Sequence, residues 1–219
     1  MAKKVFTFAD LTRLIGEDYA WRRKELKLIK DQVENPSSNS PMQNAALRFA
    51  VPILYAHWEG FVKKSCELYL EFVANKYLKH NQLKPQFIAL SLTKKLGKLE
   101  IKNIEEKTKT VEFLLNEIDK NSNIPTKNII QTKSNLRYDI FEEIIFVLDL
   151  DISKFSSYQS LINDLVDSRN NIAHGDHLRV QYSAYENMHT DIQTLMELLK
   201  NEIENAAITE TYKQPIASA

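Results

Sequence analysis

The sequence predicts an all-α protein. Its 219 residues include only 4 glycines and 6 prolines, and a sheet-rich fold of this length needs more turn-forming residues than that. Apolar residues recur at helical spacing in several long segments, and capping residues stand directly before some of them. The hydrophobic fraction of 43% and the charged fraction of 26% are typical of a globular chain that can bury its own core.

Residues 7–34 predict the first helix. Thr7 is the expected N-cap, and Asp10 places a negative charge in the first turn. The segment from Asn35 to Asn39 contains Pro36 and two serines and is expected to end the helix. Its apolar face is expected to consist of Leu11, Leu14, Ile15, Trp21, Leu26, Ile29 and Val33.

The second helix begins with a clear signature. Ser40 is the expected cap, Pro41 takes the first helical position, and Gln43 completes a capping box. We expect the helix to run to about Leu78 and to be the core helix of the fold. Its apolar stripe comprises Val51, Leu54, Tyr55, Trp58, Val62, Tyr69, Phe72 and Val73.

Residues 79–137 differ in composition from the rest of the chain and predict an insertion between core helices. This segment carries 12 Lys or Arg and 6 Asp or Glu, a net charge of +6 within a neutral protein. Short helices are expected at 85–90 and 111–119, separated by loops, and a longer one at 136–148.

The third core helix is expected to begin near Ser156, which could form a capping box with Gln159. Gly175 is its natural end, because glycine adopts the left-handed conformation of a C-cap at little cost. A last helix is expected over 182–206, with Tyr185, Met188, Ile192, Leu195, Met196, Leu199 and Ile203 facing inward. The sequence therefore predicts one domain over 1–208 and a flexible tail over 209–219.

Composition excludes several classes of protein. A net charge of zero provides no overall attraction to nucleic acid or membrane. The single cysteine, Cys66, excludes an intramolecular disulfide and a thiolate metal cluster, and its apolar helical surroundings favour a buried structural thiol. We find no signal peptide, no membrane-spanning segment and no Gly-rich phosphate loop. A cytoplasmic protein without a cofactor or a membrane contact is the expectation.

Residues 165–177 carry the chemistry. At about 100° per residue, Arg169 falls in the middle of a stripe formed by Ile162, Leu165, Val166, Ile172 and Ala173. A guanidinium cannot be deprotonated and is costly to bury unpaired. An anion is therefore expected near it, either a carboxylate of the fold or a phosphate of a ligand. A structural salt bridge, or a side chain that extends to solvent, is the alternative.

His174 lies about one turn after Asn170, at the end of the same helix. A histidine that titrates near neutrality can act as a general acid or base, and the alternative is a capping role. Asn170 and Asn171 are poor residues for a helix interior, which favours either a polar function or helix-end capping. Metal binding fits poorly, since Gly175 breaks the helix between His174 and His177, and no metal site is expected.

The segment from Arg169 to His174 (Arg-Asn-Asn-Ile-Ala-His) resembles the R-x4-H motif of the HEPN superfamily, and Gly175-Asp176-His177 resembles that family as well. The segment Tyr55–Lys64, which contains Trp-Glu-Gly-Phe, is similar to the first core helix of a bacterial branch, the MAE-like and RiboL-PSP-like HEPN toxins. The resemblance covers roughly residues 40–79 and 155–205. It implies an antiparallel helical bundle that forms a homodimer in which two motifs face each other.

The resemblance also implies metal-independent cleavage of RNA to 2′,3′-cyclic phosphate and 5′-OH ends by a toxin or antiphage defence effector, with a possible cognate antitoxin or regulatory protein. Arg169 would bind the scissile phosphate, His174 would move a proton, and Asn170 would support them. Expected supporting residues are Glu59, which could orient Arg169 or form a salt bridge, and Asn171, Asp176 and His177.

Two alternatives remain open on the sequence. Lys94, Lys95 and Lys98 could form a positive rim that binds RNA, or could simply be a solvated surface. The protein could also be a non-catalytic HEPN dimer that binds a nucleotide or a partner protein. The presence of both Arg169 and His174 favours the enzyme.

Overall fold

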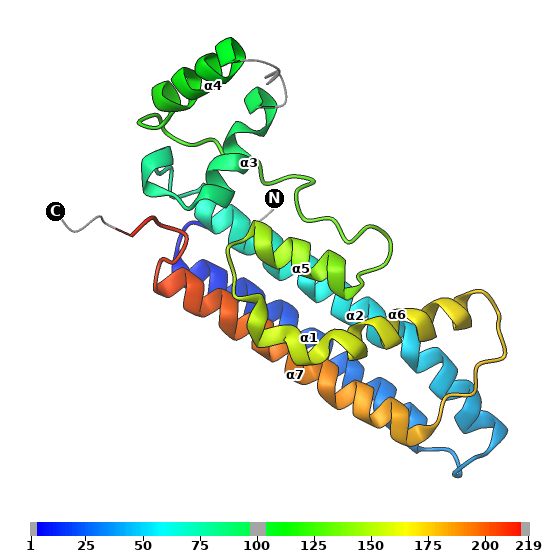
Figure 1. The fold of residues 1–219 in the computed structure, drawn as a ribbon. Coiled ribbons are helices and arrows are strands. Elements are labelled where there is room, and N and C mark those ends of the chain that lie inside the picture. Colours follow the sequence, from blue (N-terminus) through cyan, green and yellow to red (C-terminus); the bar gives the residue numbers. More distant parts are fainter. Residues whose placement is uncertain (1–3, 97–103, 216–219) are drawn as a thin grey trace.

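Four long helices form the body of the molecule (Figure 1). The computed structural model describes residues 4–96 and 104–215. The long helices are α1 (Phe8–Glu34), α2 (Pro41–Ala74), α6 (Gln159–Ala173) and α7 (Tyr182–Ile208). Helix α2 packs against the other three, and α1 and α6 run antiparallel to α2 and α7 (Figure 1). The described residues contain no β-strand, only two isolated bridges, so the all-α prediction is confirmed.

The caps of α1 and α2 follow the sequence signals in most respects. Thr7 and Asp10 form a full capping box at the start of α1. The hydroxyl of Ser40 accepts the backbone N–H of Gln43 at 3.1 Å. The predicted box at α2 is wrong in its second half, because the Gln43 side chain accepts the N–H of Asn39 at 2.7 Å. Asn39 itself has a left-handed conformation, with a φ of 58°.

Helix α2 forms the centre of the core. All eight residues predicted for its apolar stripe are buried, although the helix ends at Ala74 and not near Leu78. The prediction for α1 is wrong at Trp21, whose side chain is 47% exposed, whereas Arg22 beside it is only 9% exposed. Arg22 turns inward because Asp18 supplies a carboxylate 2.7 Å from its Nε.

The insertion contains two helices that project beyond one end of the bundle (Figure 1). They are α3 (Pro85–Leu96) and α4 (Ile104–Glu117), both longer than the sequence predicted. Helix α5 (Tyr138–Val147) then returns to the bundle. The Phe141 ring on α5 lies 5.4 Å from that of Trp58 on α2 and 5.2 Å from that of Phe155. This aromatic cluster fixes the end of the insertion against the bundle.

The start of α6 differs from the prediction. A 3-10 helix, η2 (Ile152–Tyr158), runs directly into α6. Ser156 lies inside it, and its hydroxyl donates to the carbonyl of Ser153 at 2.9 Å. The predicted capping box of Ser156 and Gln159 is therefore wrong, because the preceding turn occupies the N-terminus of the helix.

The segment after α7 is ordered against the insertion. Tyr212 is fully buried, and its carbonyl accepts the N–H of Lys84 at 2.9 Å. The N–H of Gln214 donates to the carbonyl of Gln82 at 3.0 Å. The flexible tail predicted from Thr209 is thus wrong as far as Pro215, and residues 216–219 lie outside the described part. Among the helices described, none has both the length and the apolar character needed to cross a membrane.

Candidate functional site

The guanidinium of Arg169 lies across the ring of Tyr55. Arg169 belongs to the last part of α6 and Tyr55 to the middle of α2, and the distance from Cζ to the ring centroid is 4.6 Å. Tyr55 is 2% exposed, whereas Arg169 is half-buried. One face of the guanidinium is therefore held by a cation–π contact, and its edge remains accessible.

Neutral oxygens hold the edge of Arg169. Nη1 donates to Oδ1 of Asn170 at 2.7 Å and to Oδ1 of Asn135 at 3.2 Å. Nη2 approaches the carbonyl of Ser134 at 3.4 Å. Within residues 4–96 and 104–215, no carboxylate lies within ion-pairing distance of this guanidinium. Of the two anions that the sequence left open, a carboxylate of the fold is not found within these ranges, and no described carboxylate neutralises the positive charge of Arg169.

The loop that holds Arg169 comes from the end of the insertion. Lys133 and Ser134 have φ values of 49° and 66°, and this left-handed pair turns the chain just before α5. The hydroxyl of Tyr55 accepts the N–H of Leu136 at 2.8 Å and fixes the loop to α2. Sequence reasoning did not identify Tyr55, Ser134 or Asn135 as site residues. The polar run Lys133-Ser134-Asn135 between two apolar segments was the one available signal.

Glu59 contacts the site through Tyr55 and not through Arg169. Burial raises the pKa of Tyr55, the hydrogen bond from the N–H of Leu136 opposes this, and the negative charge of Glu59 raises the pKa further. No ion pair joins Glu59 to Arg169 or His174 within the described ranges. Glu59 therefore lies one contact away from the guanidinium, with the tyrosine between them.

His174 is exposed and forms the C-cap of α6. Its backbone N–H donates to the carbonyl of Asn170 at 2.9 Å, while its imidazole makes no hydrogen bond to any described residue. Gly175 follows with a φ of 85°, the conformation predicted for the end of this helix. The imidazole is thus attached to a fixed backbone and is free to engage a ligand.

The remaining predicted residues of this segment are less constrained. Asn170 supports Arg169 directly. Asn171, Asp176 and His177 are exposed, and the first two form the helix-ending turn, in which the N–H of Asp176 donates to the carbonyl of Asn171 at 2.9 Å. The loop beyond them is held by Arg48, whose Nη1 donates to the carbonyl of Leu178 at 2.8 Å.

Two of the three residues of the predicted basic rim, Lys94 and Lys95, belong to α3, which does not lie beside this site within one chain. Lys94 is exposed on α3, and Lys95 follows it on the same helix. Helix α3 lies at the opposite end of the bundle from the C-terminal end of α6 (Figure 1). Lys98 lies outside the described residues. The insertion reaches Arg169 through Ser134 and Asn135 instead, because its last residues return to the bundle.

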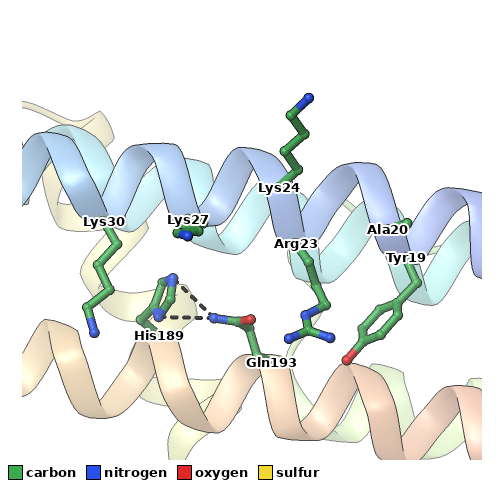
Figure 2. A pocket seen from close by; sticks show the side chains of 8 residues that line it. All are labelled: Tyr19, Ala20, Arg23, Lys24, Lys27, Lys30, His189 and Gln193. Carbon is green, nitrogen blue, oxygen red and sulfur yellow. Dashed lines mark hydrogen bonds between the residues drawn. The ribbon is translucent and has the colours of Figure 1, made fainter.

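The other titratable and metal-ligating side chains do not form a second site of the kind found around Arg169 in the described residues. No three or more His, Cys, Asp or Glu side chains gather as a metal site in the part of the chain that is described. Cys66 is buried, as predicted, and burial raises the pKa of its thiol. A hollow of about 640 Å³ lies between α1 and α7, lined by basic side chains and His189 (Figure 2). None of its lining residues belongs to the Arg169 site.

Comparison with known proteins gives one match. The sequence model of the RiboL-PSP-HEPN family matches residues 17–205. This range includes the Arg169–His174 segment, Tyr55 and the loop at Asn135. No curated protein and no solved structure shows significant similarity to the chain.

Proposed function

The chain belongs to the RiboL-PSP-HEPN family, and from that premise we propose that it is a metal-independent endoribonuclease. The main support for the proposal is the environment of the Arg169 guanidinium. Its guanidinium is oriented by a ring and three neutral oxygens, and no described carboxylate neutralises it. A guanidinium whose positive charge is not neutralised, and whose N–H donors lie in one plane, is suited to binding a phosphate.

His174 is the proposed proton carrier. An imidazole accepts a proton from the ribose 2′-hydroxyl while the 2′-oxygen bonds to phosphorus. The bond from phosphorus to the 5′-oxygen breaks, and that oxygen takes a proton from a second imidazolium. The products are a 2′,3′-cyclic phosphate and a free 5′-hydroxyl, so every proton is accounted for without a metal ion.

The need for two imidazoles favours a homodimer. One chain offers one His174, and the other exposed histidine, His177, lies beyond Gly175. A twofold axis beside α6 would bring a second His174 and a second Arg169 to the same phosphate. Asn170 would act as a positioning residue, because its amide does not titrate and its Oδ1 accepts a hydrogen bond from Arg169 at 2.7 Å. A role as a toxin or defence effector, controlled by an antitoxin, follows from the family resemblance alone.

The test is a cleavage assay with analysis of the product ends. Purified protein is incubated with single-stranded RNA of mixed sequence, with and without EDTA. We expect fragments whose 5′ ends are hydroxyls and whose 3′ ends are cyclic phosphates, at equal rates in both conditions. Fragments with 5′-phosphate ends, or loss of cleavage on chelation, would refute the mechanism. A folded dimer that binds RNA and never cuts it would favour the non-catalytic alternative.

A further inference from the structure

The α1 side of the hollow in Figure 2 is a row of cations. Arg23, Lys27 and Lys30 are spaced by four and three residues, which places them on one face of the helix. Lys24 lies at its edge. These four side chains line a single hollow in a protein whose net charge is zero. The local charge is therefore opposite to that of a phosphate backbone.

Ion pairing neutralises only one member of the row. Nζ of Lys30 lies 3.6 Å from Glu34 and 3.4 Å from Glu186. Arg23, Lys24 and Lys27 are exposed, and none of them forms an ion pair with a described carboxylate. Three adjacent cations that repel one another leave an attractive site for an anion.

Tyr19 closes one end of the row. Arg23 extends over its ring, with Cζ 5.4 Å from the centroid. The hydroxyl of Tyr19 interacts with Arg23 and with the carboxylate of Glu197. The acidic groups near the hollow thus lie at its ends, with Glu197 beside Tyr19 and Glu34 and Glu186 beside Lys30. The stretch between them, at Arg23, Lys24 and Lys27, stays positive.

The α7 side of the hollow is polar and neutral. His189 is 4% exposed, and burial lowers the pKa of its imidazole. One ring nitrogen lies 3.3 Å from the carbonyl of Leu26, and the other accepts from Nε2 of Gln193 at 3.1 Å. Figure 2 shows His189 and Gln193 facing the row from α7. The α7 side of the hollow can therefore offer hydrogen bonds, while all of the positive charge comes from α1.

The shape of the hollow favours a strand over a small molecule. From Tyr19 to Lys30 the row extends along α1 for about 16 Å, at 1.5 Å per residue. Sites for small molecules are usually enclosed and mostly apolar. An open groove with cationic side chains one helical turn apart is suited to following a phosphate backbone, as in proteins that bind single strands.

The groove is separate from the Arg169 site because α2 lies between them. Helix α1 packs on the side of α2 that carries His57 and Phe61, where the Trp21 ring lies 5.3 Å from His57 and the Tyr19 ring lies 5.7 Å from Phe61. Arg169 covers Tyr55 instead. Positions 55 and 57 are about 200° apart around a helix. Substitutions in the groove therefore leave the contacts of Arg169 intact.

We propose that the groove between α1 and α7, with Arg23, Lys24 and Lys27 as its cations, binds the phosphate backbone of single-stranded RNA outside the cleavage site. The choice of RNA as the ligand rests on the proposed function. The inference that the ligand carries phosphate groups rests only on the three cations. The groove would hold a part of the substrate that is not being cut, and would raise affinity without contributing to the chemical step.

The test measures binding to a strand that cannot be cleaved. A fluorescent single strand of 2′-O-methyl RNA is titrated with the full-length protein at several salt concentrations. The groove variant carries Arg23→Gln, Lys24→Gln and Lys27→Gln. The matched control carries Lys63→Gln, Lys64→Gln and Lys127→Gln, which remove the same charge at exposed positions outside the groove. Thermal unfolding verifies that each variant is folded.

Removing three phosphate contacts should reduce the magnitude of the negative slope of log K against log salt by about 2. We expect weaker binding and this shallower slope in the groove variant, with little change in the control. Equal affinity and slope in the two variants, or tighter binding of tripolyphosphate than of the strand, would overturn the proposal. This test and the cleavage assay can fail separately. If the wild-type protein binds the strand through the groove but cuts no RNA, only the proposed nuclease activity is refuted. If the protein cuts RNA and the groove variant binds the strand as tightly as wild type, only the proposed RNA-binding role of the groove is refuted.

Discussion

Gly60 provides the space that the guanidinium of Arg22 occupies. A Cβ atom at position 60 would lie 2.7 Å from Nη1 of Arg22. The same Nη1 donates to the carbonyl of His57 at 3.3 Å, and Nε is bound to Asp18. The Trp21 ring covers the guanidinium, with Cζ 4.6 Å from its centroid. This glycine on α2 therefore accommodates a buried ion pair that belongs to α1.

We predict that Gly60→Ala destabilises the protein by about 1–3 kcal/mol, the usual cost of overpacking a core. The new methyl group would push Arg22 away from Asp18 and from the carbonyl of His57. Urea unfolding of wild type, Gly60→Ala, Arg22→Ala and the double variant measures the effect. In the Arg22→Ala background Gly60→Ala should instead stabilise by up to about 1 kcal/mol, since the obstructing atoms are gone and alanine favours a helix interior over glycine. An equal cost in both backgrounds would contradict the steric explanation.

His174→Ala should slow RNA cleavage by about 10²–10⁴-fold, the usual contribution of a general acid–base group. RNA affinity should change little, because Arg169 and its partners are untouched. Single-turnover rates and binding of uncleavable RNA separate the two quantities. Lys127→Ala is the control, since this residue is exposed and is not part of the Arg169 site. If the His174→Ala variant cleaves RNA at the wild-type rate, His174 does not carry a proton in the reaction.

Arg169→Lys should lose activity although it keeps the positive charge. Lysine lacks the planar fork that can meet two phosphate oxygens, and it cannot reproduce the contacts with Asn135 and Asn170. We expect slower cleavage together with weaker binding, measured as a change in both kcat and KM. Arg169→Ala should be at least as impaired. Wild-type kinetics in the lysine variant would show that only the charge at this position matters.

The protein should be a homodimer at micromolar concentration. The proposed chemistry uses two imidazoles, and each chain places one His174 at the end of α6. Light scattering of the purified protein determines the mass directly. A monomer that cuts RNA at full rate would require both proton transfers to occur within one chain.

The stability of the fold should fall as the pH drops below about 6.5. Burial lowers the pKa values of His57 and His189, whereas histidine in an unfolded chain titrates near 6.5. Below that pH the unfolded chain takes up protons that the folded protein resists. The stabilisation is therefore complete above pH 6.5 and is lost as the pH falls toward the lowered values.

Urea unfolding at pH 7.5 and pH 5.5 measures this dependence. His189→Gln should reduce the difference between the two pH values, and His57 should account for part of what remains. His177→Gln, at an exposed position, should leave the difference unchanged. If His189→Gln has the same pH dependence as wild type, the imidazole of His189 titrates equally in both states.

The helices could be predicted because their signals are local. The Thr7 cap, the α2 stripe and the Gly175 stop depend on residues within a few positions of each other, so periodicity and capping rules suffice. The Trp21 error had a distant cause. The inward turn of Arg22 depends on Asp18 and also on the space at Gly60. Gly60 lies on another helix, and no periodicity within α1 contains that information.

The site could be predicted only in part, for a related reason. Arg169 and His174 lie on one helix and were identified together. Ser134 and Asn135 contact Arg169 from more than thirty residues away, through a loop with left-handed residues. Such a contact depends on where the insertion returns to the bundle, which neither composition nor spacing specifies.

Tyr212 has a consequence for how the nascent chain folds. Its ring packs 6.0 Å from that of Phe72 at the end of α2, and its carbonyl binds Lys84 at the start of the insertion. Chains are synthesised from the N-terminus at about 5–20 residues per second, so α2 and η1 (His80–Gln82) emerge long before this partner. Until residue 212 has been made, that end of the core has an apolar gap. A growing chain therefore has a site where a chaperone could bind and from which the finished fold would displace it.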